Sequence, residues 1–310
     1  MSIKDSSVCK LQKPFLKWVG GKTQIIDKII TNIPKEMYNY HESFLGGGSV
    51  LFAILSLIRQ NKIVVKNKIY AYDINSRLIN VYKDIQKNKD ELFKVISTYT
   101  KEYDEINGSE INRKPSNIQE AKTSKESYYY WIRNKYNNIN IIDNNTVEIS
   151  ALFIIINKLC FRGMYREGPN GYNVPYGHYK KTPNIITLDE LNNISNLIKD
   201  VEFRCCCFNE SFKNISEGDF VYLDPPYAPE NKKSFVGYIA DGFDLDMHKK
   251  LFNEIIKLDE KKCMFLMSNS YVDSVIEKFK NFKCENIVAR RAINSKKPES
   301  TTKEVLITNL

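Results

Sequence analysis

One stretch of this chain has the order strand, glycine-rich turn, helix and strand, which restricts the fold more than any other feature. The segment Glu42–Ser49, which contains the glycine run Gly46–Gly48, follows a short predicted strand and opens a helical pattern at Ser49. The next strand pattern covers Ile69–Tyr72 and ends at Asp73. A crossover helix between two strands is typical of a parallel sheet. The stretch therefore predicts an α/β fold with a Rossmann-like sheet.

The same stretch also predicts a nucleoside site. Glycines allow the backbone to approach a cofactor at the amino end of a helix. Asp73 lies about 25 positions after Gly48, close to the distance at which a Rossmann-type carboxylate holds ribose hydroxyls. A tight turn without a ligand would explain the glycines alone, but the downstream acid favours an adenosine cofactor.

The α/β pattern is interrupted in the middle of the chain. We expect residues 1–75 and 185–310 to form one discontinuous domain, with 76–184 inserted as a mostly helical domain. The later part predicts a helix at Leu245–Leu258 and a loop at 293–302. Its predicted strands are Val201–Phe208, Phe220–Leu223, Lys262–Met267, Glu285–Ala289 and Val305–Thr308.

Charge and cysteine content narrow the class of protein. A formal net charge of +9 favours a polyanionic partner, although a lysine-rich solvated surface would give the same total. An odd number of cysteines without a CxxC pair indicates a reducing, intracellular setting. Cys205–Cys207 is not expected to bind metal, because neighbouring strand residues point to opposite faces. The sequence has no apolar run long enough for a membrane span, and its amino terminus lacks the apolar core of a secretion signal, so we expect neither.

Four residues, Asp224, Pro225, Pro226 and Tyr227, follow the apolar run Phe220–Leu223. Ligands of open α/β sheets bind outside the carboxyl ends of the strands, and the prolines leave backbone carbonyls outside the strand ladder. A carboxylate, a free carbonyl and an aromatic face can together hold a planar base by its exocyclic amino group. The structural alternative is a proline-rich turn that caps a strand.

The segment from Phe15 to Thr23 contains Gly21-Lys22-Thr23 but is not expected to bind a nucleoside triphosphate. Leu16 occupies the position where a phosphate-binding loop needs its first glycine. Trp18 can instead stack on a ring while a lysine neutralises a carboxylate. S-adenosylmethionine carries both a ring and a carboxylate, so these residues suit it as a ligand. A buried Trp18 with surface lysines is the alternative.

A later segment, residues 161–179, alternates basic and aromatic residues. Its pattern predicts the end of a helix followed by a glycine-rich hairpin. Arginines can contact guanine edges, Met164 can contact a thymine methyl group, and Phe161 or Tyr179 can enter a base stack. A folded hairpin that merely exposes basic residues remains an alternative. We call residues 161–179 the recognition segment.

With these motifs in this order, the chain resembles the Dam-like, alpha-group DNA N6-adenine methyltransferases over nearly its whole length. The resemblance implies S-adenosylmethionine as cofactor and double-stranded DNA as partner, and it makes 76–184 a target-recognition domain that carries the hairpin. It implies a cofactor site of Trp18, Lys22, Phe44, Gly46, Gly47, Gly48, Ser49, Asp73, Ile74, Phe208 and Asp224. It implies a DNA-binding set of Lys17, Phe161, Arg162, Met164, Arg166, Asn173, Pro175, His178 and Tyr179.

The expected reaction is methyl transfer to an amine. The lone pair of an aromatic amine is delocalised, so its hydrogens must be held by acceptors. We expect Asp224 and the Pro225 carbonyl to accept them while Tyr227 stacks on an adenine rotated out of the duplex. Cytosine N4, RNA adenine and a catalytically silent DNA-binding relative remain alternatives. Arg162 and His178 depart from the pattern of GATC readers, so GATC and another short palindrome such as CATG both remain open.

Overall fold

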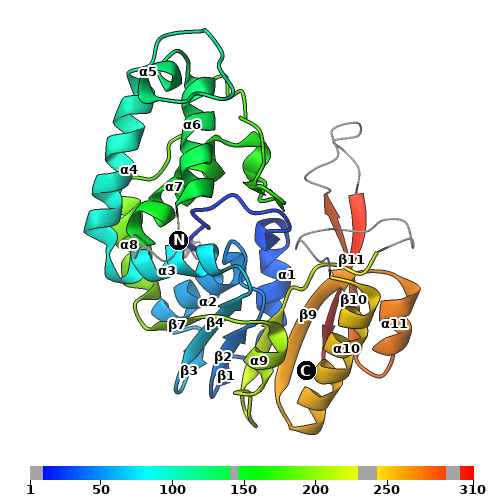
Figure 1. The fold of residues 1–310 in the computed structure, drawn as a ribbon. Helices are drawn as coiled ribbons and strands as arrows, with labels where there is room; N and C mark the ends of the chain where they lie inside the picture. The colour runs from blue at the N-terminus through cyan, green and yellow to red at the C-terminus, as the bar shows by residue number, and fades with distance from the viewer. Residues whose placement is uncertain (1–9, 140–145, 230–242, 291–300) are drawn as a thin grey trace, which may run out of the picture.

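The computed structural model describes residues 10–139, 146–229, 243–290 and 301–310, and it is a mixed α/β structure built on one large sheet (Figure 1). The sheet is parallel except at β11, which is antiparallel to both of its neighbours. In spatial order its seven strands are β10 (Lys283–Arg290), β11 (Thr301–Thr308), β9 (Met264–Ser270), β8 (Phe220–Leu223), β2 (Tyr40–Glu42), β4 (Ile69–Asp73) and β7 (Val201–Cys205).

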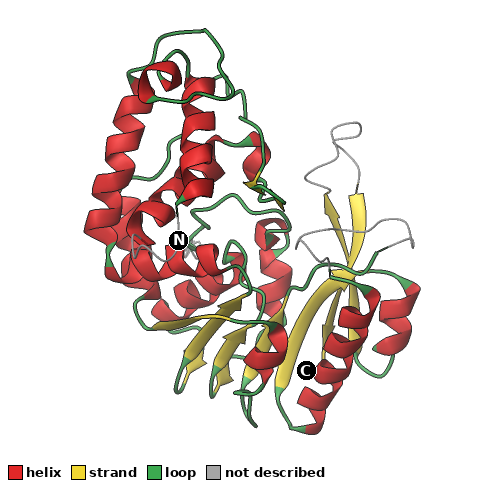
Figure 2. Cartoon of the chain, in the orientation of Figure 1, coloured by secondary structure: helices red, strands yellow, loops and turns green. Residues whose placement is uncertain are grey.

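Helices cover the sheet, and a block of helices extends beyond it (Figure 2). Two short pairs lie outside the sheet: β1 (Glu36–Met37) with β3 (Val64–Val65), and β5 (Glu167–Gly168) with β6 (Gly171–Tyr172). The described α-helices are α1 (Ile26–Thr31), α2 (Ser49–Arg59), α3 (Ser76–Lys87), α4 (Lys89–Asp104), α5 (Ile118–Ala121), α6 (Lys125–Asn138), α7 (Thr146–Leu159), α8 (Leu188–Ile198), α9 (Phe208–Phe212), α10 (Leu245–Glu260) and α11 (Asp273–Lys278). Two single-turn 3-10 helices are η1 (Lys22–Gln24) and η3 (Phe161–Gly163).

Both faces of the central strands are buried. In β8, Phe220 and Tyr222 belong to one hydrophobic cluster, whereas Val221 and Leu223 belong to the other. Successive side chains of a strand point to opposite faces, so the two clusters lie on opposite sides of the sheet. This explains why β8 is a continuous apolar run rather than an alternating one.

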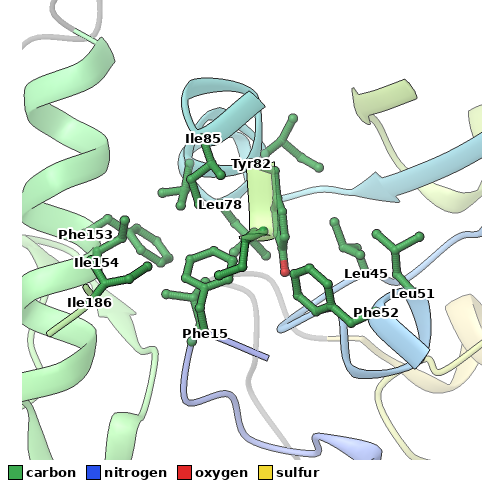
Figure 3. Close-up of a cluster of buried hydrophobic side chains, with 14 of the residues drawn as sticks. Phe15, Leu45, Leu51, Phe52, Leu78, Tyr82, Ile85, Phe153, Ile154 and Ile186 are labelled. Carbon is green, nitrogen blue, oxygen red and sulfur yellow. The ribbon is translucent and has the colours of Figure 1, made fainter. Parts of the chain in front are cut away.

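The larger cluster joins the sheet to the helical block. Figure 3 shows Phe15 and Tyr82 between Phe153 of α7 and Phe52 of α2. The rings of Phe15 and Tyr82 meet edge to face with centroids 5.6 Å apart. A single hydrophobic core therefore runs from the sheet into the helices, which fixes the recognition segment relative to the strand ends.

The predicted strands are mostly confirmed, with shifted ends. Phe220–Leu223 is a strand over its predicted length. The prediction of a strand through Phe208 is wrong, because β7 ends at Cys205 and Cys207 is the N-cap residue of α9. β9 continues to Ser270, and β11 already begins at Thr301, inside the predicted loop. Residues 293–300 of that loop lie outside the described residues.

Within the described ranges, no helix has the length and apolar character required to cross a membrane.

Candidate functional site

The carboxyl ends of three neighbouring parallel strands form the candidate site. Glu42 at the end of β2 pairs with Ala71 of β4 and Tyr222 of β8. This register places Asp73, Asp224 and the turn after Glu42 at the same edge of the sheet. The amide of Leu45 donates to the Tyr72 carbonyl at 2.8 Å, which ties the glycine turn to β4.

Asp73 fixes the glycine turn through its carboxylate. Its Oδ2 accepts from the Gly46 amide at 2.9 Å, and its Oδ1 accepts from the Asn75 amide at 2.9 Å. Burial raises the pKa of Asp73, while these amide donors lower it. A carboxylate oxygen can accept more than one hydrogen bond. Both oxygens therefore retain acceptor capacity for the hydroxyls of a ribose.

Trp18 lies against the glycine turn and explains why the turn lacks side chains. A Cβ on Gly46 would lie 2.9 Å from the Trp18 ring, and one on Gly47 would lie 2.7 Å from the Trp18 Cβ. Gly46 and Gly48 also have φ angles of +50° and +69°, which favour glycine.

Trp18 also contacts Tyr165, which the sequence analysis did not include among the site residues. The two rings stack at 5.4 Å between centroids, with 26° between their planes. Tyr165 belongs to the recognition segment, so this stack joins that segment to the region beside the glycine turn. In the sequence, only the position of Tyr165 between Met164 and Arg166, two predicted DNA-binding residues, pointed to a role at the site.

Lys22 and Asp224 form a largely buried ion pair. Their Nζ and Oδ1 atoms lie 2.8 Å apart, and the side chains are 6% and 20% exposed. The Lys22 ammonium also donates to the Gly20 carbonyl at 2.6 Å, while the Lys22 amide donates to Ser49 Oγ at 3.0 Å. Burial raises the pKa of Asp224 to about 6, and the Lys22 charge opposes that rise.

The loop after β8 is fastened to β9 and β11. The Ala228 amide donates to Asn269 Oδ1 at 3.0 Å, and Ser270 Oγ donates to the Ala228 carbonyl at 2.6 Å. The Tyr227 hydroxyl donates to Glu304 Oε2 at 2.8 Å. Pro225 is buried and Pro226 is half-buried. Glu304 was absent from the sequence prediction, because no local pattern links β11 to this loop.

Glu42 is a second buried acid that the sequence analysis missed, although its place at a strand end was a usable signal. It is 2% exposed, and its Oε2 accepts from the Tyr40 hydroxyl at 2.6 Å. Burial raises the pKa of Glu42 to about 8, against the effect of the Tyr40 hydrogen bond. Glu42 is therefore largely protonated near neutral pH.

This protonation gives a stability prediction for Glu42→Gln. The folded-state pKa of about 8 lies above the ordinary value of 4.5, so the unfolded state releases its proton first as pH rises. Wild-type stability should fall across this window, whereas a neutral glutamine adds no such dependence. Urea unfolding at several pH values should show the variant gaining free energy of unfolding relative to wild type as pH rises. A pH-independent difference would contradict the prediction.

The remaining predicted cofactor residues lie at nearby strand ends. Phe44 and Phe208 stack with ring centroids 6.1 Å apart. Ile74, directly after β4, is 55% exposed and presents an apolar surface. The amide of Cys206 donates to the Asp73 carbonyl at 3.2 Å, which keeps the end of β7 beside β4.

The recognition segment contains a smaller hairpin than its length suggested, made by β5 and β6. Phe161 is 41% exposed, and Arg162 is exposed with a φ angle of +56°. The Phe161 amide donates to the Pro175 carbonyl at 2.8 Å, and Arg166 Nε donates to Asn173 Oδ1 at 2.6 Å.

Lys17 ties the recognition segment to the chain start. Its amide donates to Asn157 Oδ1 at 2.9 Å, and its Nζ donates to the Tyr179 hydroxyl at 3.1 Å. That hydroxyl in turn donates to the Cys160 carbonyl at 2.7 Å. Tyr179 is thus held in place, and Phe161 is the more exposed of the two candidate intercalating rings.

Two other predicted DNA-binding residues have different surroundings. Met164 is half-buried and packs against the larger hydrophobic cluster. His178 is exposed, and its Nδ1 lies 3.6 Å from Glu126 Oε2. The described ranges contain no cluster of side chains suited to hold a metal ion.

The chain is similar to known DNA methyltransferases over almost its whole length. The family model of D12 class N6 adenine-specific DNA methyltransferases matches residues 18–293. The Type II methyltransferase M.MjaIII of Methanocaldococcus jannaschii is 36% identical, over 96% of this chain and 99% of that protein. The Type II methyltransferase M1.LlaDCHI of Lactococcus lactis is 30% identical, over 96% and 95%.

A third relative, a DNA adenine methylase of Haemophilus influenzae, is 28% identical, over 94% of this chain and 91% of that protein. The methyl donor of such enzymes is S-adenosylmethionine. The chain therefore belongs to the D12 class N6 adenine-specific DNA methyltransferase family.

Proposed function

We propose that this enzyme methylates N6 of an adenine that is rotated out of a short duplex sequence. The observation that carries the proposal is the position of Asp224. It is a partly buried carboxylate at the end of β8, at the same sheet edge as Asp73 and the glycine turn. A base amine presented to Asp224 would therefore lie next to a cofactor held at Asp73.

The cofactor site is proposed to use both described features of the glycine turn. Asp73 would hold the ribose hydroxyls, and the Gly46–Gly48 backbone would lie along the cofactor beside Trp18. Phe44, Ile74 and Phe208 would supply the apolar walls. When bound, S-adenosylmethionine supplies an electrophilic methyl group. Lys22 is proposed to contact the cofactor. It would then give up part of its contact with Asp224 in favour of the cofactor.

The acceptors at Asp224 and Pro225 are proposed to activate the target amine. Asp224 would accept a hydrogen bond from one amino hydrogen, and the Pro225 carbonyl would accept one from the other. Held in this way, the lone pair is less delocalised into the ring and faces the methyl donor. The methylated amine is acidic, so its proton can pass to Asp224 without a strong base. Tyr227 would stack on the flipped ring.

DNA recognition is proposed for the inserted region 76–184. β4 and β7 pair directly, with Asp73 opposite Cys205, so the chain leaves the sheet after β4 and returns beside it. Residues 1–75 and 185–310 would form the catalytic domain. Exposed Phe161, Arg162 and Arg166 would contact the duplex, with Lys17 beside them.

Sequencing of modified bases tests this proposal and identifies the target. DNA from cells expressing the wild-type protein should carry N6-methyladenine in one short palindrome, GATC or another such as CATG. DNA from cells expressing Asp224→Ala should lack it. Methylation scattered without a common sequence would contradict the proposed recognition role, and absence of methylated adenine would contradict the proposed activity.

The pKa of Asp224 gives a pH prediction. The carboxylate must be ionised to accept the amino hydrogen, and burial raises its pKa to about 6. kcat/KM should therefore rise with pH through about 6 and level off above it, because kcat/KM reports groups of the free enzyme. The residual activity of Asp224→Asn should lack this acid limb. If kcat/KM of the variant still falls at low pH, the titration belongs to a group other than Asp224.

A further inference from the structure

Glu304 connects the antiparallel strand β11 to the loop after β8, which contains Tyr227 and Ala228. Its Oε2 accepts a hydrogen bond from the Tyr227 hydroxyl at 2.8 Å. Its strand lies beside β9, where Glu304 is opposite Ser270. Ser270 in turn holds the Ala228 carbonyl at 2.6 Å. Tyr227 and Ala228 are thus both held by the same pair of adjacent strands.

This contact fixes the position of the far end of the Tyr227 ring. A tyrosine side chain has two main rotations, and a hydrogen bond at the hydroxyl restricts the first, which sets where the far end of the ring lies. The second, which sets the ring plane, is limited by the groups packed against the ring faces. On one face of the ring, the Lys22 ammonium lies 4.9 Å from the centroid. A carboxylate acceptor also makes a stronger hydrogen bond than a neutral one. Glu304 therefore holds the far end of the ring, and Lys22 limits its tilt, before any base arrives.

Glu304 is not required to hold β11 in the sheet. The strand has backbone ladders on both sides, with β10 and with β9. The Glu304 side chain is only half-buried, so its removal opens no large cavity in the core. Its contact with Tyr227 is thus an addition to the ladder contacts rather than a condition for them.

We propose that Glu304 is a positioning residue for the target base, which presets the Tyr227 ring as the stacking surface for the flipped adenine. The inference rests on the proposed base-flipping function. Preorganisation of a stacking surface lowers the entropic cost of binding. Loss of Glu304 should therefore weaken base capture and raise KM for DNA more than it lowers kcat.

The test uses the full chain and a duplex with the sequence identified by base-modification sequencing. 2-Aminopurine replaces the target adenine, and its fluorescence rises when it leaves the stack. Glu304→Ala should reduce this rise and increase KM for unmodified DNA on the order of tenfold, the range expected for weakened base stacking. Glu304→Gln, which retains an oxygen acceptor, should recover part of both. Glu285→Gln on β10 is the matched control and should match wild type; the Glu285 carboxylate contacts Lys28 at 3.6 Å and accepts from Asn32 Nδ2 at 3.1 Å, away from Tyr227.

A double variant separates positioning from general destabilisation. Tyr227→Phe removes the donor, so adding it to Glu304→Ala should cause no further loss of fluorescence response. Wild-type fluorescence and KM in Glu304→Ala, or fully additive losses, would overturn the role of Glu304. No fluorescence rise with the wild-type protein would instead overturn base flipping, and the inference would fall with it.

Discussion

Asp224→Ala should reduce methyl transfer to DNA to near the detection limit and leave DNA binding largely intact. The variant removes the charged acceptor proposed to hold the amino group, and loss of one such preorganised partner lowers kcat on the order of 10²–10³-fold. The DNA contacts proposed for the recognition segment do not involve this side chain. Methyl transfer measured with labelled donor, together with duplex binding by fluorescence anisotropy, checks both parts.

The controls must account for the partner of Asp224. Alanine leaves the buried Lys22 ammonium without its carboxylate, so stability should be measured alongside activity. Asp224→Asn retains an oxygen near Lys22 and should fold better while remaining strongly impaired. Asp246→Ala removes an exposed carboxylate at the start of α10 and should behave as wild type. Turnover near the wild-type rate in Asp224→Ala would remove the proposed role.

Gly46→Ala should reduce affinity for S-adenosylmethionine by at least on the order of tenfold. The residue has a φ angle of +50°, which costs about 1–2 kcal/mol for an L-residue, and its Cβ would lie 2.9 Å from the Trp18 ring. Either the turn or Trp18 must shift, and both flank the proposed cofactor site. Titration calorimetry with S-adenosylmethionine measures the change.

Gly218→Ala separates backbone strain from the local contact. Gly218 has a φ angle of +83°, but a Cβ there would meet only Tyr38, at an ordinary 3.6 Å. This variant should lose stability while its affinity for the cofactor stays at the wild-type value. An equal loss of affinity in both variants would show that the effect comes from global destabilisation rather than from the turn.

Features encoded by neighbouring residues were predictable from the sequence. The burial of both faces of Phe220–Leu223 makes the strand a continuous apolar run, so its limits could be read directly. The glycine turn and Asp73 were also visible, because strand ends and positive φ angles demand particular residues. The end of β7 was mispredicted, because apolar residues continue past Cys205 while Cys207 already caps a helix.

Contacts between distant segments were not predictable in this way. Glu304 meets Tyr227 only because β11 is inserted antiparallel beside β9, which no local pattern specifies. Tyr165 meets Trp18 because both rings pack against Phe153 of α7 in the shared core. Glu42 was missed for another reason, since an acid beside a glycine turn did not by itself indicate that it is buried and protonated.

The most direct test of the central claim is the chemical identity of the product. Purified protein is incubated with S-adenosylmethionine and either duplex DNA or RNA, and the digested nucleosides are analysed by mass spectrometry. The account predicts N6-methyl-deoxyadenosine from DNA, formed by the wild-type protein and absent with Asp224→Ala. N4-methyl-deoxycytidine, methylation of RNA alone, or an undiminished product from Asp224→Ala would contradict it.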